Sequence, residues 1–197
     1  PVGKPVRIAY AGDIIGRKDY VDNAIRALPH IDKDLLDSLE IHLFGAKREQ
    51  LRQQLGQDAA LLQEYAHKVI FHGFMPQEQL RKALATMDYT MLFRPDLPYT
   101  RAGFANKFAE SLAMGVPVIA NITGDMAGYL RDGQEGIIAK SERPQDIALS
   151  FTRAISVAVQ EHENMRKRAY EMARKSFWIE NYKDDIEAFL CLLEDRR

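Results

Sequence analysis

Short apolar segments alternate with amphipathic segments along the chain, and this alternation limits the folds that the sequence can adopt. The apolar runs that predict strands lie at 6–10, 40–44, 68–71, 89–93, 116–120 and 136–139. Apolar residues recur at helical spacing over 18–28, 48–65 (one helix or two, interrupted near Gly56), 77–87, 104–114, 146–159, 164–174 and 182–193. We therefore expect an α/β fold: a doubly wound, Rossmann-like parallel sheet with helices on both faces and a helical C-terminal tail.

Composition narrows the class of protein further. The 197 residues carry 27 Lys and Arg against 28 Asp and Glu, a formal net charge of −1, which argues against a partner bound by bulk charge, such as a nucleic acid. Cys191 is the only cysteine, so an intramolecular disulfide or a cysteine-rich metal site is excluded. We expect a single domain over 1–197 from a reducing, cytoplasmic compartment.

The start of the chain is unusual for a complete protein. It begins at Pro1 rather than at a methionine, and the first strand is expected only a few residues later. We therefore expect either a processed N-terminus or a piece of a longer protein.

The loop after the first strand is the first candidate site, because ligands of such sheets bind beyond the carboxyl ends of the strands. Gly12 allows a tight turn, and Arg17 and Lys18 stand where the next helix is expected to begin. Cations there oppose the helix dipole unless an anion binds between them. The two side chains are therefore either an anion site or solvated surface charges. The spacing matches neither a Walker loop nor G-x-G-x-x-G.

The segment 103–120 is the second candidate site. Gly103 precedes the expected helix, so the free amides of 104–107 would face the ligand crevice and form another anion site. Glu110 follows about two turns into this helix. Its carboxylate is expected either on the solvent face or in the crevice, where it would accept hydrogen bonds from hydroxyl groups.

Five segments match, in the same order, the motifs of one enzyme family. They are 12–18 (G-R-x-x-x-x-K in the family), 69–80 (V-x-F-x-G-x-v…e-x-L), 103–120 (G-F-G-x-x-x-x-E-A-M-A-x-G-x-P-V-I-A), 132–136 (D-G-x-x-G) and 176–178 (f-s-W). Together they cover nearly the whole chain. The sequence thus resembles the C-terminal, donor-binding domain of a GT-B-fold glycosyltransferase of the group 1, or family 4, type.

The resemblance implies a role for each matching position. Lys18 would contact the diphosphate of the sugar donor and stabilise charge on the leaving nucleotide, and Glu110 would accept hydrogen bonds from the ribose. These two residues are the expected catalytic pair. The resemblance implies the following nucleotide-sugar-binding residues: Gly12, Arg17, Lys18, Gly73 and Phe74 (framing the base), Gly103, Phe104, Ala105 and Asn106 (holding the sugar or the diphosphate), Lys107 and Glu110.

Two positions depart from the family pattern. Asp13 stands where the family commonly has Arg, so its carboxylate should point away from a diphosphate, with Arg17 supplying the missing cation. Ala102 stands where the family has a glutamate that faces the donor sugar. Members that lack this glutamate carry a Lys near the helix start, as Lys107 does here.

The activity that the resemblance implies is retaining transfer of a hexose from a UDP-, GDP- or ADP-linked sugar to an acceptor, in cell-surface polysaccharide synthesis. The acceptor would be held by an N-terminal domain of the same chain, absent here, to which the C-terminal helix over 179–197 would cross. The resemblance implies no metal and no cofactor besides the nucleotide-sugar. We expect this chain alone to bind nucleotide without transferring sugar.

Other interpretations remain open at this stage. The leading alternative is a non-catalytic nucleotide-binding or scaffolding module, and a flavodoxin-like or receiver-type protein is a weaker one. The basic residues of 166–175 form either a solvated helix face or a patch for peripheral association of the full enzyme with the inner face of the membrane. Phe177 and Trp178 are expected in the core.

Overall fold

The computed structural model describes residues 4–16 and 18–194, and it confirms the expected α/β fold. Six strands form one sheet in the order β3-β2-β1-β4-β5-β6, and each neighbouring pair is parallel. The strands are β1 Val6–Ala11, β2 Leu39–Phe44, β3 Val69–Gly73, β4 Tyr89–Leu92, β5 Val118–Asn121 and β6 Gly136–Ala139.

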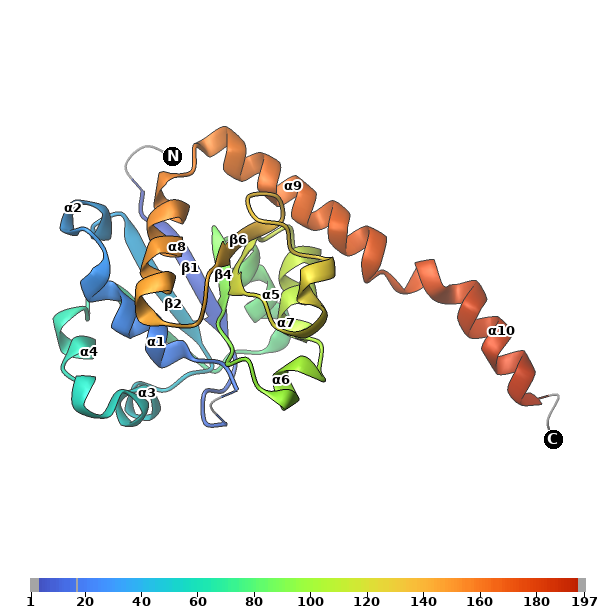
Figure 1. Cartoon of the computed structure of the whole chain (residues 1–197), viewed down its shortest axis with the longest axis horizontal. Helices are drawn as coiled ribbons and strands as arrows, with labels where there is room; N and C mark the ends of the chain where they lie inside the picture. Colours follow the sequence, from blue (N-terminus) through green and yellow to red (C-terminus); the bar gives the residue numbers. More distant parts are fainter. Residues whose placement is uncertain (1–3, 17, 195–197) are drawn as a thin grey trace.

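Helices connect the strands and cover both faces of the sheet (Figure 1). They are α1 Val21–Ala27, α2 Lys33–Leu36, α3 Arg48–Leu55, α4 Leu61–Glu64, α5 Gln77–Ala85, α6 Pro98–Arg101, α7 Asn106–Ala113, α8 Pro144–Ser156, α9 Val159–Ser176 and α10 Lys183–Glu194. In Figure 1, α1 and α8 lie in front of the sheet, and α5 and α7 lie behind it. The helices α1 and α8 contact each other, as do α7 and α9.

The central strand β1 contributes side chains to both layers of the core. Ile8 and Tyr10 belong to the cluster that includes Ile25 and Phe151, whereas Ala9 belongs to a second cluster with Leu84. Successive side chains of a strand point to opposite faces, which explains this division. The strand order reverses between β1 and β4, so the crevice where such sheets bind ligands opens at the carboxyl ends of these two strands.

Several element boundaries differ from the sequence prediction. The helix expected from residue 18 begins at Val21, because the Tyr20 amide donates to the Phe93 carbonyl at 2.7 Å and holds the loop against the end of β4. The helix expected from residue 104 begins at Asn106, since Ala105 is extended. The loop over 94–102 contains α6, a short helix with a proline at its start. The segment 48–65, by contrast, agrees with the prediction of a break near Gly56: it forms two helices, α3 and α4, on either side of it.

The C-terminal helices form the predicted tail. Helix α9 packs on α7, while α10 extends away from the sheet and its flanking helices (Figure 1). Ile186, Phe189 and Leu190 on α10 are 44%, 60% and 52% exposed. These apolar side chains therefore form a stripe that the described part of the chain leaves uncovered.

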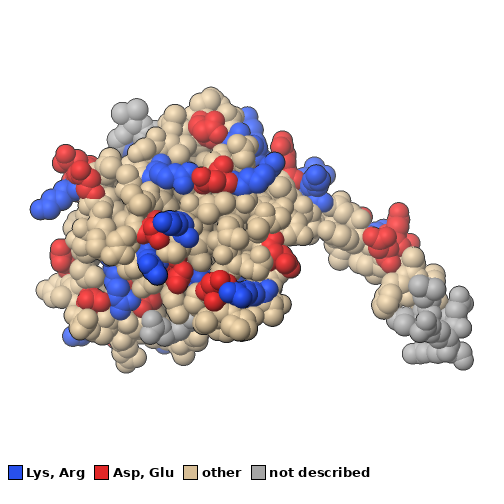
Figure 2. Space-filling view, in the orientation of Figure 1, with Lys and Arg blue, Asp and Glu red and all other residues tan. Residues whose placement is uncertain are grey.

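Charged side chains of both signs are interspersed on the face shown in Figure 2, where Lys and Arg lie beside Asp and Glu in many places. This agrees with the near-zero net charge of the sequence. Within the described residues, every helix is too short or too polar to span a bilayer.

Candidate functional site

The loops at the carboxyl edge of the sheet are tied to one another by backbone hydrogen bonds. The Gly12 amide donates to the Phe44 carbonyl at 2.9 Å, and the Gly45 amide donates to the Gly73 carbonyl at 2.7 Å. The loops after β1, β2 and β3 therefore form a continuous surface. The Tyr20 amide joins the first of these loops to the end of β4, as described above.

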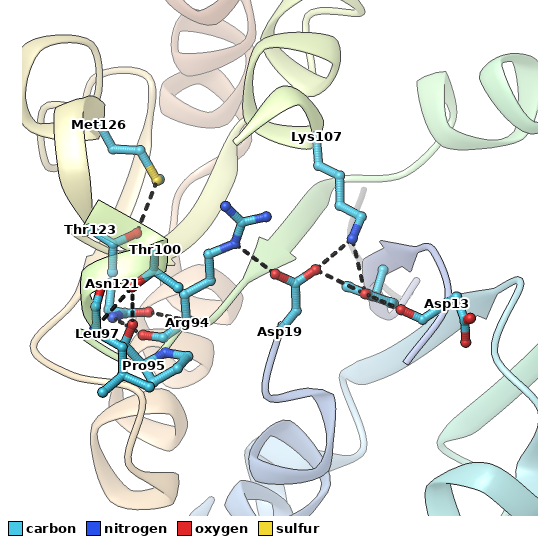
Figure 3. Close-up of polar contacts among 11 residues, drawn as sticks. Asp13, Asp19, Arg94, Pro95, Leu97, Thr100, Lys107, Asn121, Thr123 and Met126 are labelled. Carbon is cyan, nitrogen blue, oxygen red and sulfur yellow. Dashed lines mark hydrogen bonds and ion pairs between the residues drawn. The ribbon is translucent and has the colours of Figure 1, made fainter. Parts of the chain in front are cut away.

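Asp19 lies at the centre of this edge and is only 3% exposed. Its carboxylate accepts hydrogen bonds from Arg94 Nε at 2.7 Å, from Lys107 Nζ at 2.5 Å and from the Tyr10 hydroxyl at 2.9 Å (Figure 3). Asp19 precedes α1 on one face of the sheet, whereas Lys107 comes from α7 on the other face. One buried carboxylate thus joins the two helical layers above the strand ends.

Lys107 reaches this position because it crosses directly over Gly12. Its Nζ also donates to the Tyr10 hydroxyl at 3.1 Å and lies 4.8 Å from the centre of the Tyr10 ring. A Cβ atom on Gly12 would lie 2.8 Å from Lys107 Cε, and the φ angle of Gly12 is +148°. Glycine is therefore required here both for its backbone conformation and for the close approach of the lysine.

Arg94 is held from its backbone as well as from its side chain. The Asn121 side chain accepts from the Arg94 amide at 2.9 Å and donates to its carbonyl at 2.8 Å. The residue is only 8% exposed. These two hydrogen bonds from Asn121 on β5 fix the backbone of Arg94, the second residue after β4. They therefore also restrict the direction of its guanidinium.

The ionisation of the cluster follows from its contacts. Burial alone would raise the pKa of Asp19, but the charges and hydrogen bonds of Lys107 and Arg94 outweigh it and hold the pKa below its ordinary value. Burial, with the neighbouring Asp19 carboxylate, raises the pKa of Tyr10 far above its ordinary value. At neutral pH, Asp19 is therefore a carboxylate and Tyr10 a neutral phenol.

A pocket with a volume of ≈ 520 Å³ opens between α5, α7 and the face of the sheet that they cover, and it extends to Gly12 after the end of β1. Its floor is apolar, with Ala9, Leu84 and Leu92 among the lining residues. Polar groups line it as well: Gly12, Gln77, Arg81, Lys107 and Glu110. We call this the α5–α7 pocket. An apolar floor with a few convergent polar groups is typical of a small-molecule site.

A second pocket, with a volume of ≈ 240 Å³, lies on the other side of Lys107. Three cations, Lys18, Arg94 and Lys107, line it together with the segment that leads into α7. We call this the cationic pocket. Its lining residues are Lys18, Arg94, Tyr99, Thr100, Gly103, Phe104, Asn106 and Lys107. Cations beside the amides of a helix start favour a bound anion.

The structure brings most of the candidate residues to these two pockets. Gly12, Lys107 and Glu110 line the α5–α7 pocket, and Glu110 is an exposed residue at its border. Five candidate residues line the cationic pocket: Lys18, Gly103, Phe104, Asn106 and Lys107, the last of which lines both pockets.

Other candidate residues lie outside both pockets. Phe74 is 92% exposed at the end of β3, and Gly73 beside it has a φ of +68°. Ala105 is buried and directly precedes α7 without lining either pocket. Arg17 lies outside the described residues. Lys18 precedes α1 by three positions rather than standing at its start, and it lines the cationic pocket together with the segment that leads into α7. The anion site at Arg17 and Lys18 stays a prediction.

The two departures from the family pattern are both exposed residues. The Asp13 carboxylate accepts from the Ile15 amide at 2.9 Å, and Figure 3 shows it directed away from Lys107. Its charge is therefore satisfied within its own loop. Ala102 directly follows α6.

Sequence reasoning missed four residues of the site. Asp19 falls within the helix expected over 18–28 and Tyr10 within the strand expected over 6–10, and no role is expected for Arg94, because nothing local indicates that the three side chains meet. Trp178, which we expected in the core with Phe177, is 39% exposed and lines the α5–α7 pocket. A charged residue directly after a buried strand, as Arg94 is, was the one available signal.

The histidines do not gather at the site. His72 stacks on Phe44 with ring centres 4.2 Å apart, and its Nε2 lies 2.9 Å from His42 Nδ1. Burial and the neighbouring His42 lower the pKa of His72. In the described part of the chain, no group of three or more His, Cys, Asp or Glu side chains could hold a metal ion.

Comparison with known proteins gives this site its family. Residues 5–156 match the family model described as "Glycosyl transferases group 1". The chain is 26% identical over 189 residues to an uncharacterised glycosyltransferase of Methanocaldococcus jannaschii. The aligned region covers 91% of this chain and 44% of that relative. The chain thus spans less than half the length of this curated relative.

Solved structures show the same fold. Anabaena HepE, in complex with UDP and glucose, superposes with a TM-score of 0.76 at 17% identity, over 96% of this chain and 49% of its own. The C-terminal domain of a group 1 glycosyl transferase, LpcC of Francisella tularensis, gives 0.68 at 19% identity, over 89% of both chains. From its sequence match and its fold, this chain belongs to the group 1 glycosyltransferases, as a C-terminal domain of that family.

Proposed function

We propose that this domain binds the nucleotide-sugar donor of a glycosyltransferase, and that the whole enzyme transfers the sugar to an acceptor. The observation that carries the proposal is a pair of pockets that share Lys107: one lies over the sheet between α5 and α7 and reaches Gly12, and the other lies at the loops after β1 and β4. One pocket offers an apolar floor with a carboxylate, and the other offers cations. A nucleoside diphosphate has the matching parts: a flat base and a ribose, followed by a phosphate chain.

Each part of the ligand is assigned a place in this proposal. Nucleoside binds in the α5–α7 pocket, where Glu110 accepts hydrogen bonds from the ribose hydroxyls. The diphosphate lies along Lys107 into the cationic pocket, where Lys18 and the amides near Asn106 contact it. These cations stabilise the negative charge that develops on the leaving nucleoside diphosphate. Gly73 and Phe74, at the end of β3, border the base from the outer side.

The identity of the nucleotide is proposed from the structural neighbours. HepE is described as binding UDP and glucose, so UDP is the first nucleotide to test here, followed by GDP and ADP. We propose a hexose as the transferred sugar and retention as the stereochemical course, in keeping with the family resemblance of the motifs. Because Ala102 offers no side-chain hydrogen bond, we assign the sugar contacts to Asn106 and the loop after β4. A role in cell-surface polysaccharide synthesis belongs to the same proposal.

The acceptor is proposed to bind to an N-terminal domain of the same chain. The exposed stripe of α10, with Ile186, Phe189 and Leu190, supports this, because burial against a second domain would remove these apolar side chains from water. Figure 1 shows α10 extending away from the sheet, in agreement with the exposure of these side chains. We propose that this helix crosses to that domain.

A cytoplasmic location at the inner face of the membrane remains a proposal for the full enzyme. Two arginines of the basic segment are already engaged: Arg166 donates to the Ala85 and Met87 carbonyls, and Arg168 donates to Glu161 and to carbonyls near Gly133. Lys167, Arg174 and Lys175 are exposed and would be the side chains to contact an anionic surface.

A titration of the purified domain with UDP, GDP and ADP tests the proposal. We expect at least one diphosphate to bind, with a higher affinity than the corresponding nucleoside. Failure of all three to bind to folded protein would refute the assignment of the donor site. The domain alone should show no sugar transfer, since the acceptor side is absent.

The alternative is a non-catalytic nucleotide-binding or scaffolding module. Two positions favour it: Asp13 stands where the family commonly has an arginine, and Ala102 stands where the family has a glutamate. A longer chain that includes the upstream domain distinguishes the two. Incorporation of labelled sugar into an acceptor supports the enzyme, whereas nucleotide binding without any transfer or donor hydrolysis supports the module.

A further inference from the structure

The terminal nitrogens of Arg94 are the unexplained feature of the edge. The Arg94 side chain uses only Nε in its contact with Asp19, at 2.7 Å. Figure 3 shows both Nη atoms directed away from that carboxylate, and no hydrogen bond joins them to any described residue. A guanidinium carries five N–H donors in a rigid fork, so four remain. Arg94 lines the cationic pocket, which is where these donors are available.

Other partly buried arginines of this protein use their Nη atoms. Arg26 donates through Nη1 to Asp22 and Asn23, and through Nη2 to the carbonyls of Gln54 and Leu55. Arg166 donates through Nη1 and Nη2 to carbonyls. In both of these arginines, the Nη atoms donate hydrogen bonds to other groups of the protein, as expected for a structural role. Arg94, at 8% exposure, is more enclosed than either and leaves them free for something else.

The position of Arg94 is fixed before any ligand arrives. Asn121 bonds to both its amide and its carbonyl, and Asp19 holds Nε. Asp19 is fixed in turn by Lys107 and Tyr10. The fork is therefore preorganised, so a ligand that contacts it does not bear the entropic cost of ordering a long side chain.

Charge points to an anion as that ligand. The cationic pocket is lined by Lys18, Arg94 and Lys107, and the acidic group that faces them is Asp19. Among the described residues, these three positive charges and one negative charge leave an excess of two, which a diphosphate would balance. Arginine binds phosphate through two parallel N–H···O bonds more readily than lysine does, because of its planar fork.

We propose that Arg94 is a further ligand-binding residue of this site, and that its two Nη atoms bind a phosphate of the nucleoside diphosphate while Asp19 positions them. This rests on the donor-binding function proposed above and assigns it a contact that the motifs do not include. Arg94 is the residue that touches the ligand, and Asp19 acts through it.

The test compares Arg94→Lys and Arg94→Gln with the unchanged protein. Lysine keeps the charge and can keep the ion pair with Asp19, but its single nitrogen then leaves no fork for the ligand. Arg101→Gln is the matched control: it removes one positive charge nearby, from an exposed residue that pairs with Asp96 and lines neither pocket. Affinity is measured by NMR titration for whichever of UDP, GDP and ADP binds best, and for its nucleoside.

We expect Arg94→Gln to weaken diphosphate binding by about 10- to 100-fold and Arg94→Lys by about 10-fold, as the loss of charge-assisted hydrogen bonds predicts. Both should leave nucleoside affinity within about twofold, and Arg101→Gln should leave diphosphate affinity within about twofold, because an exposed charge is screened. A thermal melt of each variant confirms that the protein is folded at the titration temperature.

Two results would overturn the proposal while leaving the donor site intact. Diphosphate affinity unchanged in folded Arg94→Lys and Arg94→Gln would show that the fork does not contact phosphate. Equal losses for diphosphate and nucleoside would show that Arg94 only supports the shape of the site. Absence of diphosphate binding in the unchanged protein is a different outcome, which refutes the proposed function itself.

Discussion

Arg94 Nε lies 2.7 Å from Asp19 Oδ1, although the two residues are 75 positions apart in the sequence. One follows β4 and the other precedes α1, and they meet at the reversal of strand order between β1 and β4. Lys107 joins them from α7 on the opposite face of the sheet. A buried ionic cluster of Asp19, Arg94 and Lys107 thus holds the loops together at the carboxyl edge of the sheet. The proposed phosphate contacts depend on the positions that this cluster gives to its two cations.

The first prediction concerns the carboxylate at the centre of the cluster. Asp19→Asn should lower the free energy of unfolding by about 3 kcal/mol, because it leaves two neighbouring cations without their buried partner. Urea unfolding followed by circular dichroism measures the change. Asp96→Asn removes the same charge from an exposed pair with Arg101 and should produce no measurable change. Equal effects in the two variants would contradict the central role of Asp19.

The pH dependence of stability follows from the same group. The pKa of Asp19 is below its ordinary value of 3.8 in the folded protein, so the unfolded chain binds more protons near that pH. The stability that Asp19 contributes is therefore present above about pH 4 and is lost as the pH falls through the folded pKa. The free energy of unfolding of the unchanged protein and of Asp19→Asn is measured between about pH 7 and pH 3. The difference between the two proteins should stay constant down to about pH 4 and shrink below it. A difference that grows on acidification would show that the sign is wrong.

A third prediction tests the approach of Lys107 to the first loop. Gly12→Ala should destabilise the fold by about 1–2 kcal/mol and weaken nucleotide binding, because its Cβ would collide with Lys107 and its φ of +148° is strained for alanine. Gly16→Ala is the control in the same loop, since a Cβ there meets no atom within 4 Å. Thermal melts and the nucleotide titration give both readouts. Indistinguishable behaviour of the two variants would argue against a functional contact at Gly12.

Substitutions of Glu110 and Lys18 should distinguish the binding of the nucleoside from the binding of the phosphates. Glu110→Gln should weaken the binding of both nucleoside and diphosphate by about tenfold, since each carries a ribose. Lys18→Ala should weaken only the diphosphate, by a similar factor. Glu163→Gln, an exposed glutamate on α9, serves as the control for charge. If Lys18→Ala reduced nucleoside affinity as much as diphosphate affinity, the placement of phosphate in the cationic pocket would be wrong.

The last prediction compares two phenylalanines. Phe189→Ala on α10 should leave the melting temperature of this domain nearly unchanged, because the side chain is 60% exposed and outside the core. Phe151→Ala on α8, at 0% exposure, should cost about 3–5 kcal/mol. In a chain that includes the upstream domain, Phe189→Ala should become destabilising. Equal stability of that longer chain with and without the substitution would argue against α10 as the contact between domains.

Much of the fold was predictable because the relevant signals are local. Alternating apolar runs and helical spacing predicted the parallel sheet and its covering helices. Gly12 and Gly103 each line one of the two pockets. The boundaries were less predictable: α1 begins at Val21 because Tyr20 bonds to the end of β4, a contact between distant segments. Trp178 was expected in the core because a large aromatic ring is usually buried, but it lines a pocket instead.

The sequence by itself determined the class of fold, the edge of the sheet where a site would lie and the family motifs, since these depend on residues close together in the chain. Only the tertiary structure decided which charged side chains meet. The ion pair of Asp19 with Lys107 spans 88 positions and requires the strand order to bring α7 over the first loop. Neither residue carries a local sign of that contact, because its energy comes from burial and from neighbours that the fold alone supplies.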